Sequence, residues 1–140
     1  MQLNPYLSFN GQCEAAFKFY EQCLGSKINA MMSWGELPDD DPMAGQVSPE
    51  WRDKVMHISL PVGDRELMGS DSPPEYYEEP KGFSISISID GPAEAERVFK
   101  ALAENGTIKM PIQETFWAAR FGMLVDQFGI PWMVNCDQAS

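Results

Sequence analysis

Histidine and cysteine are scarce in this sequence of 140 residues. The single histidine is His57, so every mechanism that needs an imidazole must use this residue. The three cysteines, Cys13, Cys23 and Cys136, are odd in number and show no CxxC spacing. This pattern favours buried thiols in a reducing compartment over a disulfide framework.

Basic side chains and long apolar runs are also few. The chain has 10 Lys plus Arg against 21 Asp plus Glu, which gives a formal net charge of −11. Nucleic acids and anionic membranes require basic patches, so we expect neither as a partner. No segment approaches the ~18 apolar residues of a membrane span, and the first residues lack the basic and apolar regions of a secretory signal. We therefore expect a cytoplasmic protein.

The remaining composition is typical of one globular domain. The chain is 44% hydrophobic and 22% charged, and its length predicts a single domain over residues 1–140. Two amphipathic stretches, residues 12–24 and 92–104, carry apolar side chains at helical spacing and predict two helices.

The ends of these helices carry further signals. Asn10 and Asp90 are the expected N-caps, and Gly25 is expected to stop the first helix. Cys13 lies at a helix N-terminus, where the dipole could lower its pKa, but its place on the apolar stripe favours a buried, inert thiol. Asp71 ends a predicted strand, where capping of the following loop is favoured over catalysis.

The predicted strands form an internal repeat. The tripeptides at 9–11 and 89–91 lie 80 residues apart, and each is followed by a helix and then by three strands. The pattern predicts an α+β fold of two β-α-β-β-β modules, the first about 3–71 and the second about 82–136, with about eight strands in total. The strands are expected at residues 6–9, 27–34, 54–60, 65–69, 83–89, 107–113, 117–125 and 131–136.

Two segments rich in proline and acidic residues, 35–52 and 71–81, are expected to be surface loops. The first is long for a compact domain, which makes it a candidate lid or partner contact. A mobile acidic insertion without such a role is an equal alternative.

The residues at both ends of the chain also resemble a known family. Segments 4–11, 54–57 and 67–71, and above all 113–122 and 126–135, are similar to PhnB-like proteins of the vicinal oxygen chelate superfamily. This superfamily includes glyoxalase I, extradiol dioxygenases and the bleomycin and fosfomycin resistance proteins. The resemblance implies paired β-α-β-β-β modules and a homodimer whose sheets form cups across the interface.

The resemblance also implies where a metal would bind in related enzymes. Its four inward ligand positions fall on Pro5, Ser84, Met133 and a position near Glu66. Proline and methionine do not hold a hard cation and serine is a poor ligand, so the usual divalent metal is not predicted. Neither a GxGxxG motif nor a P-loop is present, so no nucleotide cofactor is predicted either.

Three residues are candidates for acid–base chemistry. His57 on its predicted strand shares a face with Val55 and Ser59, where it could act as a general base or ligand, or be a hydrogen-bonded structural residue or an interface residue. Glu114 lies in an apolar and aromatic stretch that would disfavour its charged form, but an ion pair with Arg120 is the favoured alternative. Glu66 is the other carboxylate that could act with His57.

The aromatic residues on strands suggest a ligand cavity. We expect an apolar pocket whose candidate lining residues are Trp34, Met68, Trp117, Arg120 and Trp132. The same side chains could instead fill the space and leave no cavity.

Three functions follow from these residues. The first is a protein that binds a small, largely apolar or aromatic molecule in a cup formed at the dimer. The second is an enzyme of the same superfamily with a rearranged site, with or without a metal, that uses His57 with Glu114 or Glu66. The third is an interaction module that uses the acidic loop 35–52.

Overall fold

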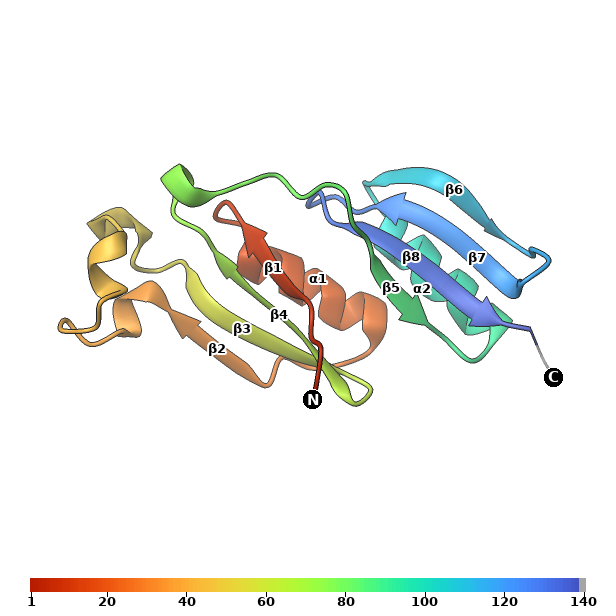
Figure 1. Ribbon diagram of the computed structural model, residues 1–140, viewed down its shortest axis with the longest axis horizontal. Helices are drawn as coiled ribbons and strands as arrows, with labels where there is room; N and C mark the ends of the chain where they lie inside the picture. The colour runs from red at the N-terminus through yellow and green to blue at the C-terminus, as the bar shows by residue number, and fades with distance from the viewer. Residues whose placement is uncertain (139–140) are drawn as a thin grey trace. The chain divides into compact units, whose positions relative to one another are not determined.

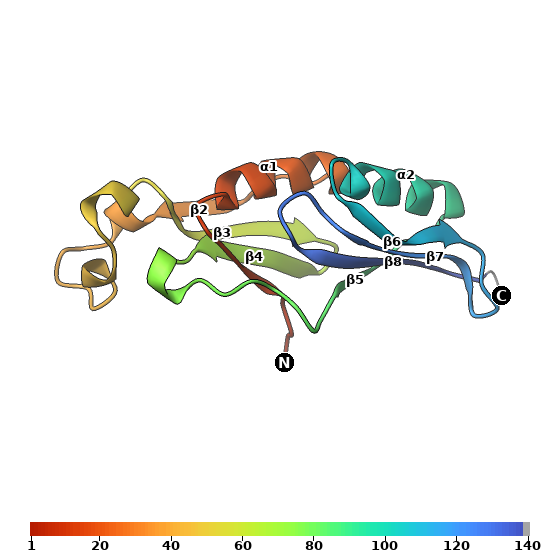
Figure 2. The ribbon, with the colours of Figure 1, turned by 90° about the horizontal axis from the view of Figure 1, so that it is seen from above.

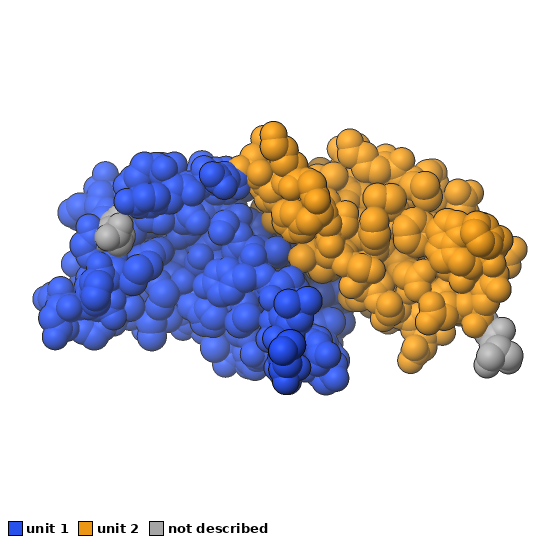
Figure 3. All heavy atoms as spheres, in the orientation of Figure 1, with its two compact units in different colours: residues 1–78 blue, residues 79–140 orange. Residues whose placement is uncertain are grey.

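The computed structural model describes residues 1–138 and contains eight strands and two α-helices in that range (Figure 1). This confirms the predicted α+β fold of two β-α-β-β-β modules. The chain divides into two compact units, unit 1 over Met1–Glu78 and unit 2 over Glu79–Ser140 (Figure 3). Each predicted module lies inside one unit. Unit 1 holds β1 Tyr6–Phe9, α1 Cys13–Leu24, β2 Ala30–Ser33, β3 Val55–Val62 and β4 Arg65–Asp71, and unit 2 holds β5 Ile85–Ser88, α2 Pro92–Ala103, β6 Thr107–Gln113, β7 Ala118–Val125 and β8 Pro131–Asp137.

Unit 1 is a four-stranded sheet covered on one face by a single helix (Figure 2). The strand order is β1-β4-β3-β2, in which β1 runs parallel to β4 and the other neighbours are antiparallel. The helix α1 packs on β3 and β4. Its apolar stripe and the facing strand residues form the core, which includes Leu7, Phe9, Ala16, Phe17, Tyr20, Ile58, Leu60 and Leu67.

Unit 2 repeats this architecture. Its strand order is β5-β8-β7-β6, again with one parallel pair, β5 with β8. The helix α2 packs on β6, β7 and β8. Its core includes Ala95, Val98, Phe99, Leu102, Leu124, Trp132 and Val134.

In each unit the sheet face opposite the helix is called here the open face. Strand residues alternate between the two faces, so the helix-facing residues of β3, Ile58 and Leu60, assign His57 and Ser59 to the open face. The same alternation applied to the registers gives the open face of unit 1 as Tyr6, Ser8, Met32, His57, Ser59, Glu66, Met68 and Ser70. The open face of unit 2 comprises Ser86, Ser88, Met110, Gln113, Phe121, Met123, Met133 and Asn135.

The predicted N-caps were wrong. The residues that precede the helices are Gln12 and Gly91, and neither makes a side-chain cap hydrogen bond. Asn10 and Asp90 therefore do not cap. The predicted helix stop is confirmed, because Gly25 ends α1 in the left-handed conformation at φ 68°.

The segment predicted as a long loop after β2 contains short helical turns. Three 3-10 turns lie at Trp34–Glu36, Ala44–Gln46 and Pro49–Trp51, and a fourth lies at Pro74–Tyr76 in the second predicted loop. The strand expected at 27–34 is shorter, at Ala30–Ser33. Neither α-helix among the described residues has the length and apolar character needed to cross a membrane.

Candidate functional site

The open face of unit 1 joins a tyrosine to the only histidine. The Tyr6 hydroxyl lies 3.1 Å from His57 Nδ1, and the two ring centroids are 5.8 Å apart. The hydrogen bond runs in either direction according to the imidazole tautomer. The strands β1 and β3 are both neighbours of β4, which brings residues 51 positions apart into contact.

Serine hydroxyls adjoin this pair. Ser70 pairs with Ser8 across the strands and makes a side-chain hydrogen bond to Tyr6. Burial raises the pKa of the Tyr6 phenol, and the Ser70 hydrogen bond partly opposes this rise. Ser59 is 4% exposed, and its buried hydroxyl oxygen has no hydrogen-bond partner among the described residues.

Methionine side chains give the same surface an apolar character. Met32 lies opposite His57 on the neighbouring strand, and Met68 lies opposite both Tyr6 and Ser59. Flexible thioethers adapt to irregular partners and are common at binding surfaces. The arrangement can hold an apolar molecule while a phenol–imidazole pair donates, accepts or transfers a proton.

Of the two glutamates proposed as partners for His57, Glu66 lies in the same unit but not beside it. Glu66 lies on β4 four residues from Ser70, about 13 Å along the strand, and accepts a hydrogen bond from Asn29 Nδ2 at 3.2 Å. Glu114 belongs to unit 2 and is exposed, so the apolar environment expected around it is absent.

The predicted ion pair between Glu114 and Arg120 is also wrong. Arg120 Nε instead donates to Glu96 Oε1 of α2 at 2.9 Å. A register shift between Ala118 and Arg120 in the β7–β8 ladder accompanies this placement. The Arg120 side chain therefore lies on the helix-covered face of the unit 2 sheet.

The five residues proposed to line a ligand pocket occupy different environments. Met68 is on the open face of unit 1, and Trp34 is buried in unit 1 with its indole N–H donated to the Asp71 carbonyl at 3.0 Å. Trp132 is 2% exposed and donates its indole N–H to the Asp126 carboxylate, so it fills the core of unit 2. Of the three proposed lining residues in unit 2, Trp117 is the exposed one, and its ring packs edge-on against Phe121 with ring centroids 5.5 Å apart.

The superfamily's usual metal positions do not fit a divalent cation in this chain. Pro5 precedes β1, Ser84 precedes β5, and Met133 lies on the open face of β8. These side chains offer no hard anionic oxygen or imidazole ligand. Among residues 1–138, no group of three or more His, Cys, Asp or Glu side chains lies close enough to hold a metal ion.

Sequence reasoning found His57 but missed Tyr6, Ser59 and Ser70. The alternation of Tyr6-Leu7-Ser8-Phe9 assigns Tyr6 and Ser8 to one face, which was a usable signal. The contact itself depends on the strand order, which a single sequence does not give.

The fold and the two repeated units define a class of protein. The chain matches the family model of the Glyoxalase/Bleomycin resistance protein/Dioxygenase superfamily over residues 2–134, and it belongs to that superfamily. The predicted membership in the vicinal oxygen chelate superfamily is thereby confirmed.

Individual relatives agree with this assignment. The chain is 35% identical over 139 residues to Protein YjdN of Escherichia coli (strain K12), covering 96% of this chain and 95% of YjdN. The crystal structure of protein PA1353 from Pseudomonas aeruginosa shares 50% identity over 99% of both chains, with a TM-score of 0.86. The PhnB protein from Bacillus cereus shares the fold at 23% identity, with a TM-score of 0.75 over 97% of this chain and 99% of that chain.

Proposed function

We propose that this protein binds a small, largely apolar or aromatic molecule in a cup formed when two copies of the chain join their open faces. The observation that carries the proposal is the open face of unit 1, where the Tyr6–His57 pair stands between Met32 and Met68. Small-molecule sites are mostly apolar with a few well-placed polar groups, and this surface has that composition.

Exposed apolar side chains support the second copy as the cover. On unit 1, Tyr6 is 49% and Met32 is 39% exposed, and on unit 2, Phe116 is 90% and Trp117 is 50% exposed. Tyr6 and Met32 both neighbour His57, and Phe116 contacts Trp117, and exposed apolar patches mark interaction surfaces. A cup lined by such residues is completed only when another chain covers it.

A thermal-shift and ligand-detected NMR screen of substituted phenols and naphthalenes tests the binding. We expect at least one compound to raise Tm saturably, and Met68→Glu to abolish the effect because it places a charge on the apolar surface. Arg65→Gln, an exposed change on the same strand, is the matched control and should bind normally. If no compound binds saturably, the proposal is refuted.

Light scattering after size exclusion tests the assembly. We expect a particle of twice the 15.7 kDa chain mass at micromolar concentration. A monomer that still binds its ligand would refute the dimeric cup.

A second function, acid–base catalysis, is favoured by the Tyr6–His57 hydrogen bond. A phenol and an imidazole in contact can pass a proton between substrate and solvent. Compounds found to bind should then be assayed for chemical conversion. We expect Tyr6→Phe and His57→Gln each to lower kcat while binding persists, and full turnover in both variants would remove the pair from the mechanism.

A further inference from the structure

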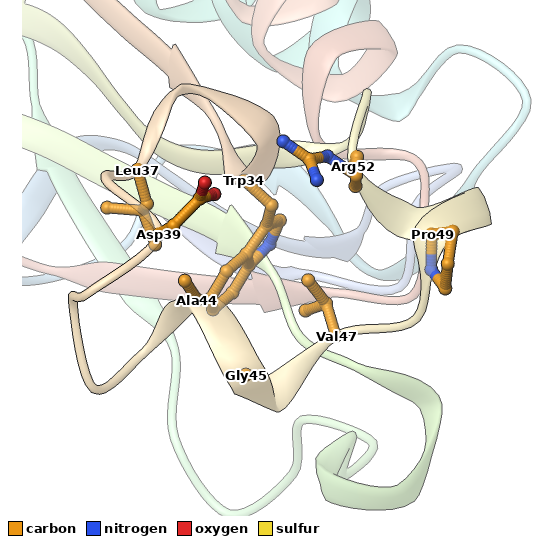
Figure 4. Close-up of a pocket in the computed structure, with 8 residues that line it drawn as sticks. All are labelled: Trp34, Leu37, Asp39, Ala44, Gly45, Val47, Pro49 and Arg52. Atoms are coloured by element: carbon orange, nitrogen blue, oxygen red, sulfur yellow. The ribbon is translucent and has the colours of Figure 1, made fainter.

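The segment that follows β2 encloses a small cavity of its own within unit 1 (Figure 4). The cavity has a volume of about 190 Å³. It shares no lining residue with the open face that carries Tyr6 and His57. Its walls include Trp34, Leu37, Asp39, Ala44, Val47 and Arg52.

The tryptophan wall is rigidly held. Trp34 is 6% exposed, its indole N–H donates to the Asp71 carbonyl at 3.0 Å, and its backbone N–H donates to the Lys54 carbonyl at 2.9 Å. The indole N–H and the backbone N–H of Trp34 are therefore both hydrogen-bonded within the protein. The ring can offer its apolar surface to a ligand without reorganisation.

The arginine wall is held by the same segment. The Gly35 N–H donates to the Arg52 carbonyl at 2.7 Å, and Arg52 Nη2 donates to the Gly35 carbonyl at 3.3 Å. A Cβ at Gly35 would lie 3.0 Å from the Arg52 carbonyl oxygen, so this close approach favours glycine. The guanidinium has five N–H donors, and this hydrogen bond uses one of them.

An acidic side chain stands in the same cavity. Figure 4 shows the Asp39 carboxylate and the Arg52 guanidinium directed toward the space beside Trp34. No ion pair joins Asp39 to Arg52 among the described side chains. One negative and one positive group thus flank an apolar surface without neutralising each other by contact.

We propose that this cavity binds a small zwitterion, a free α-amino acid with a short aliphatic side chain. The ligand's ammonium group faces Asp39, its carboxylate faces Arg52, and its aliphatic part lies against Trp34 and Val47. Asp39 and Arg52 are both exposed, and paired opposite charges favour a ligand that carries both signs because only such a ligand matches both of them.

The size of the cavity agrees with such a ligand. Pockets for drug-sized compounds run to about 300–1,000 Å³, and this cavity lies below that range. The neighbouring acidic residues Glu36, Asp40 and Glu50 disfavour a purely anionic ligand by long-range repulsion. A purely cationic ligand would leave the Arg52 guanidinium in the wall without an anionic partner.

Three isosteric probes test the proposal on the full chain. L-leucine carries both charges, 3-methylbutylamine lacks the carboxylate, and 4-methylpentanoate lacks the ammonium group. Titrations followed by the indole N–H resonances of ¹⁵N-labelled protein should show saturable shifts of the Trp34 signal with L-leucine. We expect each single-charge probe to bind about tenfold more weakly or worse. Equal binding of the amine, or no shift with L-leucine, would overturn the proposal.

Variants of the two charged walls complete the test. Asp39→Asn and Arg52→Gln should each weaken L-leucine binding by about tenfold. Asp40→Asn and Arg65→Gln are the matched controls outside the cavity and should bind as the original chain does. Because Arg52 also holds Gly35, Asp39→Asn is the decisive variant, and unchanged binding in it would refute the assignment.

Discussion

The Asp71 carboxylate accepts three backbone hydrogen bonds in unit 1, and its replacement makes a sharp prediction. Asp71 is 1% exposed. Its Oδ1 accepts the backbone N–H groups of Gly11 and Cys13, both at 2.9 Å, and its Oδ2 accepts that of Val55 at 3.0 Å. One side chain therefore ties the start of α1 to two strands. The expectation that Asp71 caps the loop that follows it was wrong, because the N–H groups that its carboxylate accepts belong to Gly11, Cys13 and Val55.

The effect of Asp71→Asn follows from these three bonds. If the asparagine carbonyl oxygen still accepts the N–H groups of Gly11 and Cys13, its NH₂ group faces the Val55 N–H, and two donors cannot form a hydrogen bond. The buried Val55 N–H then has no acceptor, at a cost of about 1–3 kcal/mol. The two retained bonds lose their charge assistance, about 1 kcal/mol each. Removing a buried charge relieves part of its desolvation penalty. We therefore expect a net loss of about 2–4 kcal/mol in the free energy of unfolding.

Urea unfolding followed by far-UV circular dichroism and tryptophan fluorescence measures this loss. Hydrogen exchange of the Val55 amide locates it, because this proton should lose protection first. Asp53→Asn, an exposed change in the same unit, is the control and should alter stability by less than about 0.5 kcal/mol. A cost below about 1 kcal/mol for Asp71→Asn, with Val55 still protected, would refute the reasoning.

Three further predictions concern close packing and titration. Gly69→Ala should cost about 1–3 kcal/mol, because its Cβ would lie 2.8 Å from Phe17 Cε1, whereas Gly91→Ala meets nothing within 4 Å; equal Tm values for both variants would contradict this. Burial, with the nearby Asp71 and Glu14 charges, raises the pKa of the Cys13 thiol, so the native chain should not react with Ellman's reagent and should react only after unfolding. The pKa of Tyr6 is raised above the ordinary value of about 10, so its neutral phenol contributes to the stability of the folded state below that pH. This contribution is lost as pH rises through the folded-state pKa. An ultraviolet titration of the chain, compared with that of Tyr6→Phe, checks this.

The predictions that depend on local pattern were confirmed. The period-two alternation around Ile85 and Ile87 and the apolar stripes of residues 12–24 and 92–104 gave the elements because one face of each is buried. The repeat with its offset of 80 residues predicted the order of helices and strands along the chain in both units. Element ends were less accurate, because the start of α1 is determined by Asp71, which lies 58 residues from Cys13 in the chain.

The predictions that required tertiary neighbours were the ones that the structure changed. The sequence predicts an ion pair of Arg120 with the nearby Glu114, but Arg120 instead donates a hydrogen bond to Glu96 of α2. Trp132 was assigned to an open pocket because it lies on a strand, yet alternation of β8 directs it to the core, where Asp126 accepts its N–H. Which face of a strand is buried depends on the helix that packs against it, and single-sequence patterns leave that choice open.

The registers of the two units also show where the chemistry of this protein can lie. Tyr6 pairs with Met68 in unit 1, and Ser86 pairs with Met133 in unit 2, so Tyr6 corresponds to Ser86. Ser70 and Asn135 each lie two residues after these methionines, so they correspond as well.

The same superposition matches His57 to Phe121 and Ser59 to Met123. At these four positions the first repeat therefore carries a phenol, an imidazole and two hydroxyls, whereas the second carries only one hydroxyl, an amide and two apolar side chains. Duplication of the fold has not duplicated the titratable groups. A proton-transfer role at these positions must consequently belong to unit 1, and the matching surface of unit 2 can contribute apolar contact but no acid or base.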